Sequence, residues 1–351
     1  MIDVRMLLLG ASGPLNLKTL YCAARCGTVH LATDAGNVAA RSRYAASHDV
    51  VDLKAAPGQS LATLAEICRR YDIEVVIPGD MAAAAFLAEH RGELPAPIFP
   101  ASDAAALHAI HDKWSFAERL QAANLPTPTT RLIPSRAAFD PAIADAIGYP
   151  LIVKPLNGES SHGVVRIDGP DRLRAHVLGD APYSEPPLIV QQFVDGYDID
   201  CSVIAEEGEV IASAVQRWDE KGALAFERND AIEAQSAAII REFGYTGAAH
   251  FDFRHDAATG RFLVLECNPR FWFTMPAAMW CGLNFVEAGI RHVLGMPTAP
   301  AATASGEYVL PGDIVRRFAT PGKLANVRRS NWRGFLQPVT DPIPHFFSTG
   351  R

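Results

Sequence analysis

Two neighbouring stretches decide the fold: His250-Phe-Asp-Phe-Arg254 and Arg261-Phe-Leu-Val-Leu-Glu-Cys-Asn-Pro-Arg270. Each is a short apolar run, and the segment between them contains Asp256 and Gly260, which favour a turn. Such a pair predicts a β-hairpin. Side chains alternate along a strand, so two sets are each expected on one side of their strand: His250, Asp252 and Arg254, and then Glu266, Asn268 and Arg270.

Two carboxylates and an amide therefore converge on this predicted hairpin. Oxygen ligands of this kind suit Mg²⁺, which prefers hard donors and usually keeps open positions for water and nucleotide phosphates. Glu266 interrupts a strongly apolar run. Burying a carboxylate there costs free energy unless it has a partner. The sequence thus predicts metal ligation by Asp252, Glu266 and Asn268. The alternative is a salt-bridged surface hairpin.

A lysine and a glycine-rich segment lie upstream of the hairpin. The run Leu151-Ile-Val-Lys154-Pro155 reads as a strand, and a Gly/Ser-rich loop follows it. Glycines allow backbone N–H groups to approach phosphates, hydroxyls donate further hydrogen bonds, and a lysine supplies a point charge. The loop is not a Walker P-loop, because the lysine precedes the glycines. The candidate phosphate ligands are Lys154, Gly158, Ser160, Ser161 and Gly163.

The hairpin pattern resembles the ATP-grasp superfamily, particularly its carbamoyl phosphate synthetase-like and biotin carboxylase-like branch. The resemblance implies ATP as a ligand and two Mg²⁺ ions, replaceable by Mn²⁺, on Asp252, Glu266 and Asn268. It also implies that Arg270 and Lys154 stabilise the transferring phosphoryl group. Cations neutralise the negative charge on the phosphate oxygens, and this electrostatic stabilisation is the main requirement for catalysis of phosphoryl transfer. The assignment is therefore physically reasonable.

Two further segments match the same family. Lys113, at the start of a predicted helix, resembles its second phosphate lysine, although a solvated lysine is the default for such a residue. The segment 190–198 resembles its adenine-binding linker, with Gln191 in place of the usual acid; an exposed strand and turn is the alternative. The resemblance implies adenine contacts from Gln191, Gln192, Phe193 and Val194, and a ribose contact from Asp198.

The remaining sequence indicates the domain organisation. Strand-like and amphipathic runs alternate over the first hundred residues, which predicts a parallel α/β domain, whereas the closely spaced strands after residue 150 predict antiparallel sheets. Helices are expected near Asp112–Ala123 and Asp230–Phe243. We expect a mixed α/β and α+β protein with four parts: a pre-ATP-grasp domain (1–105), a small lid subdomain with a linker helix (106–195), a large subdomain with the metal site (196–300) and a C-terminal extension (301–351).

Composition excludes several classes of protein. The chain has 351 residues and a formal charge of -7 without a Lys/Arg-rich stripe, which argues against nucleic-acid binding. Apolar runs are too short to span a bilayer and no leader is evident, so we expect a cytoplasmic protein. The six cysteines lack paired CxxC spacing and are expected to be core thiols. The turn Gly10-Ala-Ser-Gly13 lacks the third glycine of a dinucleotide site.

The resemblance implies a carboxylate–amine ligase that forms an amide through an acyl phosphate and releases ADP and phosphate. Its expected partners are a small carboxylate, such as an amino acid, and an amine, with a homodimer permitted. The alternatives are a carboxylase or carbamoyl phosphate synthetase-like enzyme acting through carboxyphosphate, and a non-catalytic ATP-binding module. Four residues are candidate substrate contacts: His250, Arg217, Arg228 and Trp272. The two arginines also fit a solvated surface, and the rings at 271–273 also fit the core.

Overall fold

A computed structural model describes residues 2–156, 158, 162–220, 222–297, 303–309, 336–337 and 339–347. The chain divides into two compact units, and each is described by itself. The first contains residues 1–107, 201–250 and 268–351, and the second contains residues 108–200 and 251–267.

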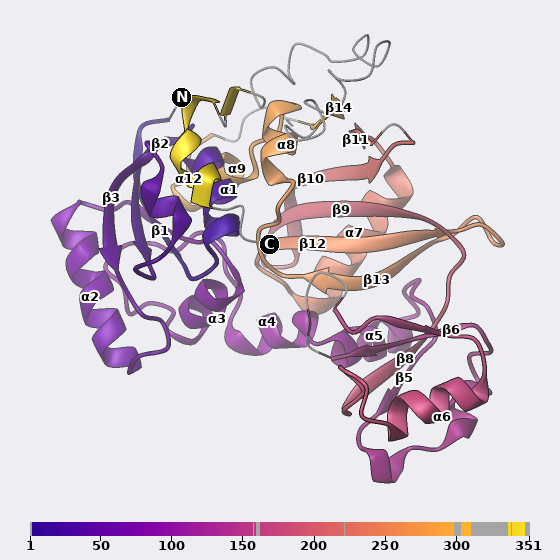
Figure 1. Cartoon of the computed structure of the whole chain (residues 1–351). Helices are drawn as coiled ribbons and strands as arrows, with labels where there is room; N and C mark the ends of the chain where they lie inside the picture. The colour runs from indigo at the N-terminus through magenta and orange to yellow at the C-terminus, as the bar shows by residue number, and fades with distance from the viewer. Residues whose placement is uncertain are drawn as a thin grey trace. The chain divides into compact units, whose positions relative to one another are not determined.

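A four-stranded parallel sheet opens the first unit, as the alternating pattern predicted. Its strands are β1 (Val4–Gly10), β2 (Gly27–Thr33), β3 (Ala45–Val50) and β4 (Val75–Pro78), in the order β3-β2-β1-β4. Alternate residues of β1 point to opposite faces. Met6 and Leu8 pack with α1 (Gly13–Ala23), whereas Leu7 and Leu9 pack with α2 (Pro57–Arg70) and α3 (Met81–Glu89), so helices cover both faces (Figure 1).

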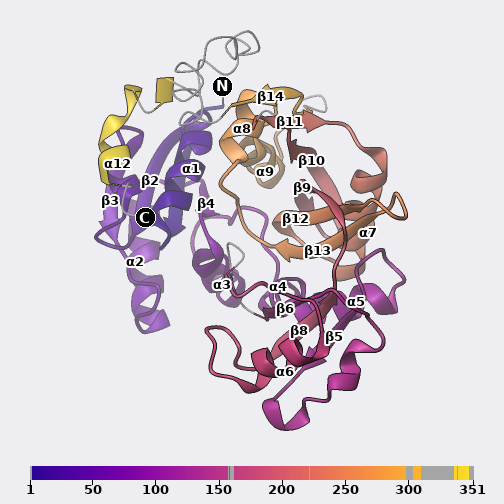
Figure 2. The same ribbon diagram turned by 45° about the vertical axis from the view of Figure 1, so that its right-hand side comes forward.

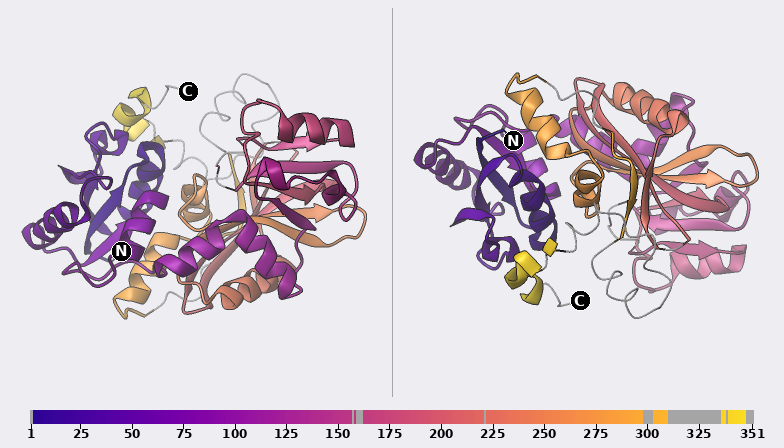
Figure 3. Two further views of the ribbon diagram at one scale, coloured as in Figure 1. Left: turned by 90° about the horizontal axis from the view of Figure 1, so that it is seen from below. Right: turned by 90° about the horizontal axis from the view of Figure 1, so that it is seen from above.

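A six-stranded sheet has the order β13-β12-β9-β10-β11-β14. Its strands are β9 (Gly196–Glu206), β10 (Glu209–Trp218), β11 (Leu224–Glu227), β12 (Gly247–Asp256), β13 (Phe262–Asn268) and β14 (Gly306–Tyr308). The helix α7 (Asp230–Phe243) packs against β10 (Figure 3). Asn229 caps its first turn and Gly244 ends it in the left-handed conformation, so the predicted helix is confirmed.

The second unit contains a four-stranded antiparallel sheet of order β5-β8-β6-β7. Its strands are β5 (Thr130–Ile133), β6 (Leu151–Pro155), β7 (Val165–Ile167) and β8 (Leu188–Gln192). The helix α6 (Pro170–Leu178) packs on one face through Leu173 and Val177 (Figure 2). The helix α5 (Lys113–Ala122) begins after Asp112, whose carboxylate accepts from the Ser115 N–H at 2.8 Å.

Short helices complete the described chain: α4 (Ala104–His111), α8 (Met275–Trp280), α9 (Phe285–Val293) and α12 (Pro342–Phe347). None of the described helices is both long and apolar enough to cross a bilayer. All six cysteines are buried free thiols, as the sequence predicted. Burial raises the pKa of Cys26 to about 12 and that of Cys68 to about 11.

Candidate active site

One face of the small sheet carries three polar side chains. Residues directly opposite each other in antiparallel strands share a face, and the register pairs Lys154 with Ile189, Ile152 with Gln191, and Gln191 with Thr130. Lys154, Gln191 and Thr130 therefore lie on one face. The other face is apolar and packs against α6; it comprises Leu151, Val153, Leu188 and Val190. Lys154, Gln191 and Thr130 are buried, and α6 covers the opposite, apolar face.

Two lysines converge on one carboxylate in the second unit. Lys154 Nζ lies 3.3 Å from Glu266 Oε2, and Lys113 Nζ lies 3.7 Å from the same oxygen. Lys113 also donates to the Gly158 carbonyl oxygen at 3.0 Å, so it contacts the start of the predicted phosphate loop. Ser160 and Ser161 lie outside the described residues. Gly163 has φ +76°, and an added Cβ there would lie 2.7 Å from the Tyr183 Cβ, so this position favours glycine.

The carboxylates of the hairpin are half-buried and lie close together. Asp252 and Glu266 share a side-chain hydrogen bond. Burial, with Asp200 and Glu266 nearby, raises the pKa of Asp252 well above its ordinary value. Burial also opposes ionisation of Glu266, but Lys154 and Lys113 outweigh it and lower the pKa of that carboxyl. Such a donor set fits a divalent cation, which would relieve the repulsion between neighbouring carboxylates.

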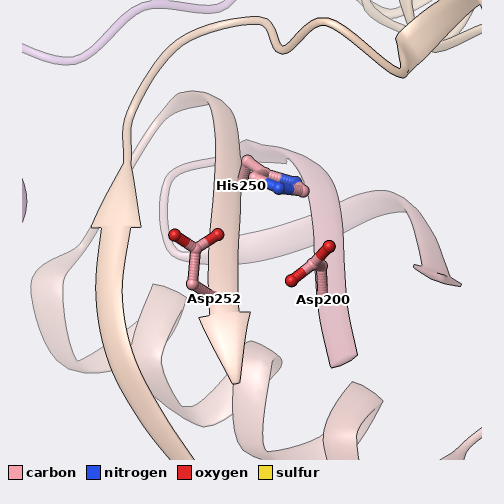
Figure 4. A group of neighbouring side chains, drawn as sticks. All are labelled: Asp200, His250 and Asp252. Carbon is pink, nitrogen blue, oxygen red and sulfur yellow. The ribbon is translucent and has the colours of Figure 1, made fainter. Parts of the chain in front are cut away.

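Three ligand atoms gather where β9 and β12 run side by side in the six-stranded sheet. Asp200, His250 and Asp252 each offer one such atom within 4.8 Å of the others (Figure 4). His250 Nδ1 lies 2.8 Å from Ser202 Oγ, and its ring stacks on Trp272 with centroids 5.4 Å apart. The sequence analysis missed Asp200. Asp198 and Asp200 are two positions apart and so share one face of β9, and this spacing was the signal present in the sequence.

The linker after β8 is held by an arginine whose role the sequence analysis also missed. Arg254 donates to the carbonyl oxygens of Val194 at 2.6 Å and Gly196 at 3.0 Å, and its Nη1 lies 2.6 Å from Asp198 Oδ1. Its guanidinium lies 6.0 Å from the centre of the Phe193 ring. The predicted ribose contact Asp198 is therefore already ion-paired, although its side chain is 71% exposed.

The other predicted linker residues fall on both sides of the strand end. Gln191 is buried and donates through Nε2 to Thr130 Oγ1 at 3.1 Å. Gln192 is exposed, and its Oε1 accepts from the Thr129 N–H at 3.3 Å. Phe193 lies beneath the Arg166 guanidinium at 4.6 Å. Val194 is buried. The backbone groups of 192–194 are thus placed at the edge of the polar face.

The first unit holds the remaining candidate residues. Arg270 donates to the carbonyl oxygen of Phe271 at 3.0 Å, and Asn268 ends β13. Trp272 is buried in the core, as one of the two interpretations of its ring expected, and it stacks on His250. Arg217 pairs with Glu227 at 3.0 Å and Arg228 with Asp230 at 2.6 Å; both pairs are exposed, as on a solvated surface.

Comparison with protein families matches two parts of the chain. Residues 184–310 match the family described as ATP-grasp in the biosynthetic pathway with Ter operon, and residues 125–229 match the C-terminal part of D-Ala-D-Ala ligases. These matches together include β6, the linker and the acidic hairpin. Over residues 125–310 the chain is therefore similar to ATP-grasp and D-Ala-D-Ala ligase families.

Relatives and solved structures of ATP-grasp proteins agree with this assignment. D-alanine–D-alanine ligase B of Chromobacterium violaceum is 29% identical over 198 residues, 55% of this chain and 58% of that protein. The carbamoyl phosphate synthase large chain of Streptomyces avermitilis is 27% identical over 226 residues, 59% of this chain and 20% of that protein. The chain therefore spans less than two thirds of either relative.

The crystal structure of N5-carboxyaminoimidazole synthetase from Staphylococcus aureus superimposes with a TM-score of 0.66 at 15% identity. It covers 92% of this chain and 87% of that one. The fold predicted from the sequence, a parallel α/β domain followed by ATP-grasp sheets, is confirmed.

Proposed function

We propose that this protein is an ATP-dependent ligase that joins a carboxylate to an amine, with release of ADP and phosphate. The observation that carries the proposal is the convergence of Lys154 and Lys113 on Glu266 beside Asp252. Phosphoryl transfer needs positive charge near the phosphate oxygens and oxygen ligands for a metal ion, and such a site offers both. The similarity to a D-alanine–D-alanine ligase over 198 residues supports the reaction class.

Roles are assigned to the residues as follows. Asp252, Glu266 and Asn268 would hold Mg²⁺, with two ions expected and Mn²⁺ as a substitute; the metal supplies charge neutralisation on the phosphate oxygens. Lys113 and Lys154 leave Glu266 for the phosphates when ATP and metal enter. Arg270 stabilises charge on the transferring phosphoryl group. Gln191, the backbone of 192–194 and Asp198 bind adenosine, with Asp198 exchanging part of its Arg254 contact for the ribose.

The proposed reaction has two steps. A carboxylate oxygen of the substrate attacks the γ-phosphorus in line, which breaks the bond to the β-phosphate oxygen and gives ADP and an acyl phosphate. The neutral amine then attacks the acyl carbon, phosphate leaves, and the amine loses a proton. Positioning and electrostatic stabilisation suffice for both steps, so no protein nucleophile is required.

Substrate contacts are proposed at His250 and Trp272, with Arg217 and Arg228 as further candidates. Ser202 and Trp272 fix the orientation of the His250 ring. We propose amino acids as substrates and keep the four-part domain division, with boundaries at 105, 195 and 300. The cellular location proposed is the cytoplasm, with a homodimer permitted.

The experiment measures ADP and phosphate release with Mg-ATP over a panel of amino acids and small carboxylates, with products identified by mass spectrometry. The variant Glu266→Gln removes the negative charge that both lysines share. Glu209→Gln is the matched control, because Glu209 pairs with Arg241 on the exposed surface. Release that needs one carboxylate and one amine, yields their condensed mass and vanishes only in Glu266→Gln supports the ligase. ATP binding without turnover for any pair points instead to a non-catalytic module.

A second candidate function is carboxylation or carbamoyl phosphate formation through carboxyphosphate. The match to a carbamoyl phosphate synthase large chain favours it. Bicarbonate replaces the carboxylate substrate in this reaction, and the metal and lysine roles are unchanged. Phosphate release stimulated by bicarbonate alone, with no amino acid present, would select this function over the ligase.

A further inference from the structure

A chain of hydrogen bonds ends at the proposed adenine contact. Thr130 Oγ1 lies 2.9 Å from the Pro128 carbonyl oxygen, and Gln191 Nε2 lies 3.1 Å from Thr130 Oγ1. Thr130 and Gln191 are directly opposite each other on β5 and β8. Their exposed fractions are 0% and 3%, so water cannot readily replace either contact.

The chemistry of the groups decides which atom donates and which accepts in each of these hydrogen bonds. A carbonyl oxygen only accepts, so the Thr130 hydroxyl must give its single proton to Pro128. The Thr130 oxygen can then only accept, and of the two ends of the Gln191 amide only the NH₂ end can donate to it. The Gln191 amide is therefore held with Nε2 toward Thr130 and Oε1 away from it.

The oxygen end of the Gln191 amide is left as a pure acceptor. Within the described part of the chain, nothing donates a hydrogen bond to Gln191 Oε1. Gln191 shares its sheet face with Lys154, which contacts the metal-site acid Glu266. A nucleotide with its phosphates at Lys154 and its base at the linker meets this oxygen at the edge of the purine.

We propose that Thr130 is a positioning residue that makes the site selective for a 6-aminopurine over a 6-oxopurine. This inference rests on the proposed function, in which ATP occupies the polar face. A glutamine alone is permissive, because a half-turn of its amide offers oxygen to the 6-amino group of adenine or NH₂ to the 6-oxo group of hypoxanthine. Thr130 removes the second orientation, since turning the amide would set two oxygen acceptors against each other.

The experiment compares the Kd values of ATP and ITP, which share ribose and phosphates, by isothermal titration calorimetry with Mg²⁺. The full chain is tested as wild type, Thr130→Val and Thr130→Ser. In Thr130→Val the amide can turn, and the ratio of the ITP Kd to the ATP Kd is expected to fall by about tenfold, a change of about 1.4 kcal/mol. Thr130→Ser keeps the hydroxyl and is expected to keep the wild-type ratio.

A double variant separates positioning from structural damage. A carboxylate offers only acceptors in any orientation, so Thr130→Val/Gln191→Glu is expected to regain the preference for ATP. Thermal melts verify folding, and Thr130→Ala takes the place of Thr130→Val if the valine variant does not fold. An unchanged ratio in the variant without the hydroxyl overturns the inference while the proposed function stands. Failure of the wild type to bind ATP overturns the proposed function and the inference with it.

Discussion

Lys154 Nζ lies 3.3 Å from Glu266 Oε2, although the two residues are 112 positions apart in the chain. The lysine side chain is 6% exposed and that of the glutamate 23%. Burial lowers the pKa of Lys154, and Glu266 opposes that effect. The two side chains therefore form a largely buried ion pair in which each charge offsets the desolvation cost of the other.

Glu266→Gln is expected to lower the free energy of unfolding by about 3 kcal/mol, because it leaves a buried ammonium without its carboxylate. Lys154→Met/Glu266→Gln removes the more deeply buried of the two ammonium groups near Glu266 and is expected to recover part of this loss, since Lys113 remains. Urea denaturation followed by fluorescence measures both. A double variant as unstable as the single one would contradict the explanation.

Arg254→Lys is expected to weaken ATP binding by about tenfold, since lysine cannot replace three guanidinium contacts with the linker. Arg261→Lys, at an exposed position of the same hairpin, is the control and should leave the Kd unchanged. Calorimetry gives the affinities. Hydrogen exchange of residues 193–198 should rise in Arg254→Lys alone. Unchanged exchange would mean that the arginine does not order the linker.

Gly196→Ala is expected to destabilise the linker. Gly196 has φ +149°, and an added Cβ would lie 1.8 Å from the His255 carbonyl oxygen. Gly260→Ala is the comparison, since its φ is +69° but no atom lies within 4 Å of the added Cβ. Both substitutions strain the backbone by about 1 kcal/mol or more, and only the first adds a steric clash. A larger drop in Tm for Gly260→Ala would refute this ranking.

Stability is expected to fall as the pH drops below 6.5, partly through His176. Burial, and then Arg172, lowers the pKa of this buried histidine below its ordinary 6.5. Between the lowered value and 6.5 the unfolded chain binds the proton and the folded chain does not, so acid favours unfolding there. Denaturation midpoints at pH 7.5 and 5.5 test this. The fall should be smaller in His176→Gln, whereas exposed His108→Gln should match wild type.

Local pattern predicted much of the fold. The hairpin strands β12 and β13 and the helix α7 were expected almost at their observed bounds, because alternation, an Asn cap and a terminal glycine all act within a few residues. The polar strand β3 and the alanine-rich helix α3 were missed, since neither carries an apolar pattern with a clear period. Propensity alone did not identify them.

The candidate site was predictable only where a motif carries its own chemistry. Lys154, Asp252 and Glu266 could be selected from their neighbours in the sequence. The contact of Arg254 with Asp198, and that of Thr130 with Gln191, depend on which strands become neighbours. Sheet order is set by packing over the whole chain, so no short stretch of sequence contains that information.

Because all six native cysteines are buried, the protein is well suited to site-directed labelling. Maleimide reagents attack exposed thiolates, and the native thiols are buried. A single cysteine introduced at a surface position of either unit would therefore carry a dye or spin label without first removing the natural ones. With one label on each unit, distance measurements in solution could follow the two units through nucleotide binding and turnover in an otherwise unaltered chain.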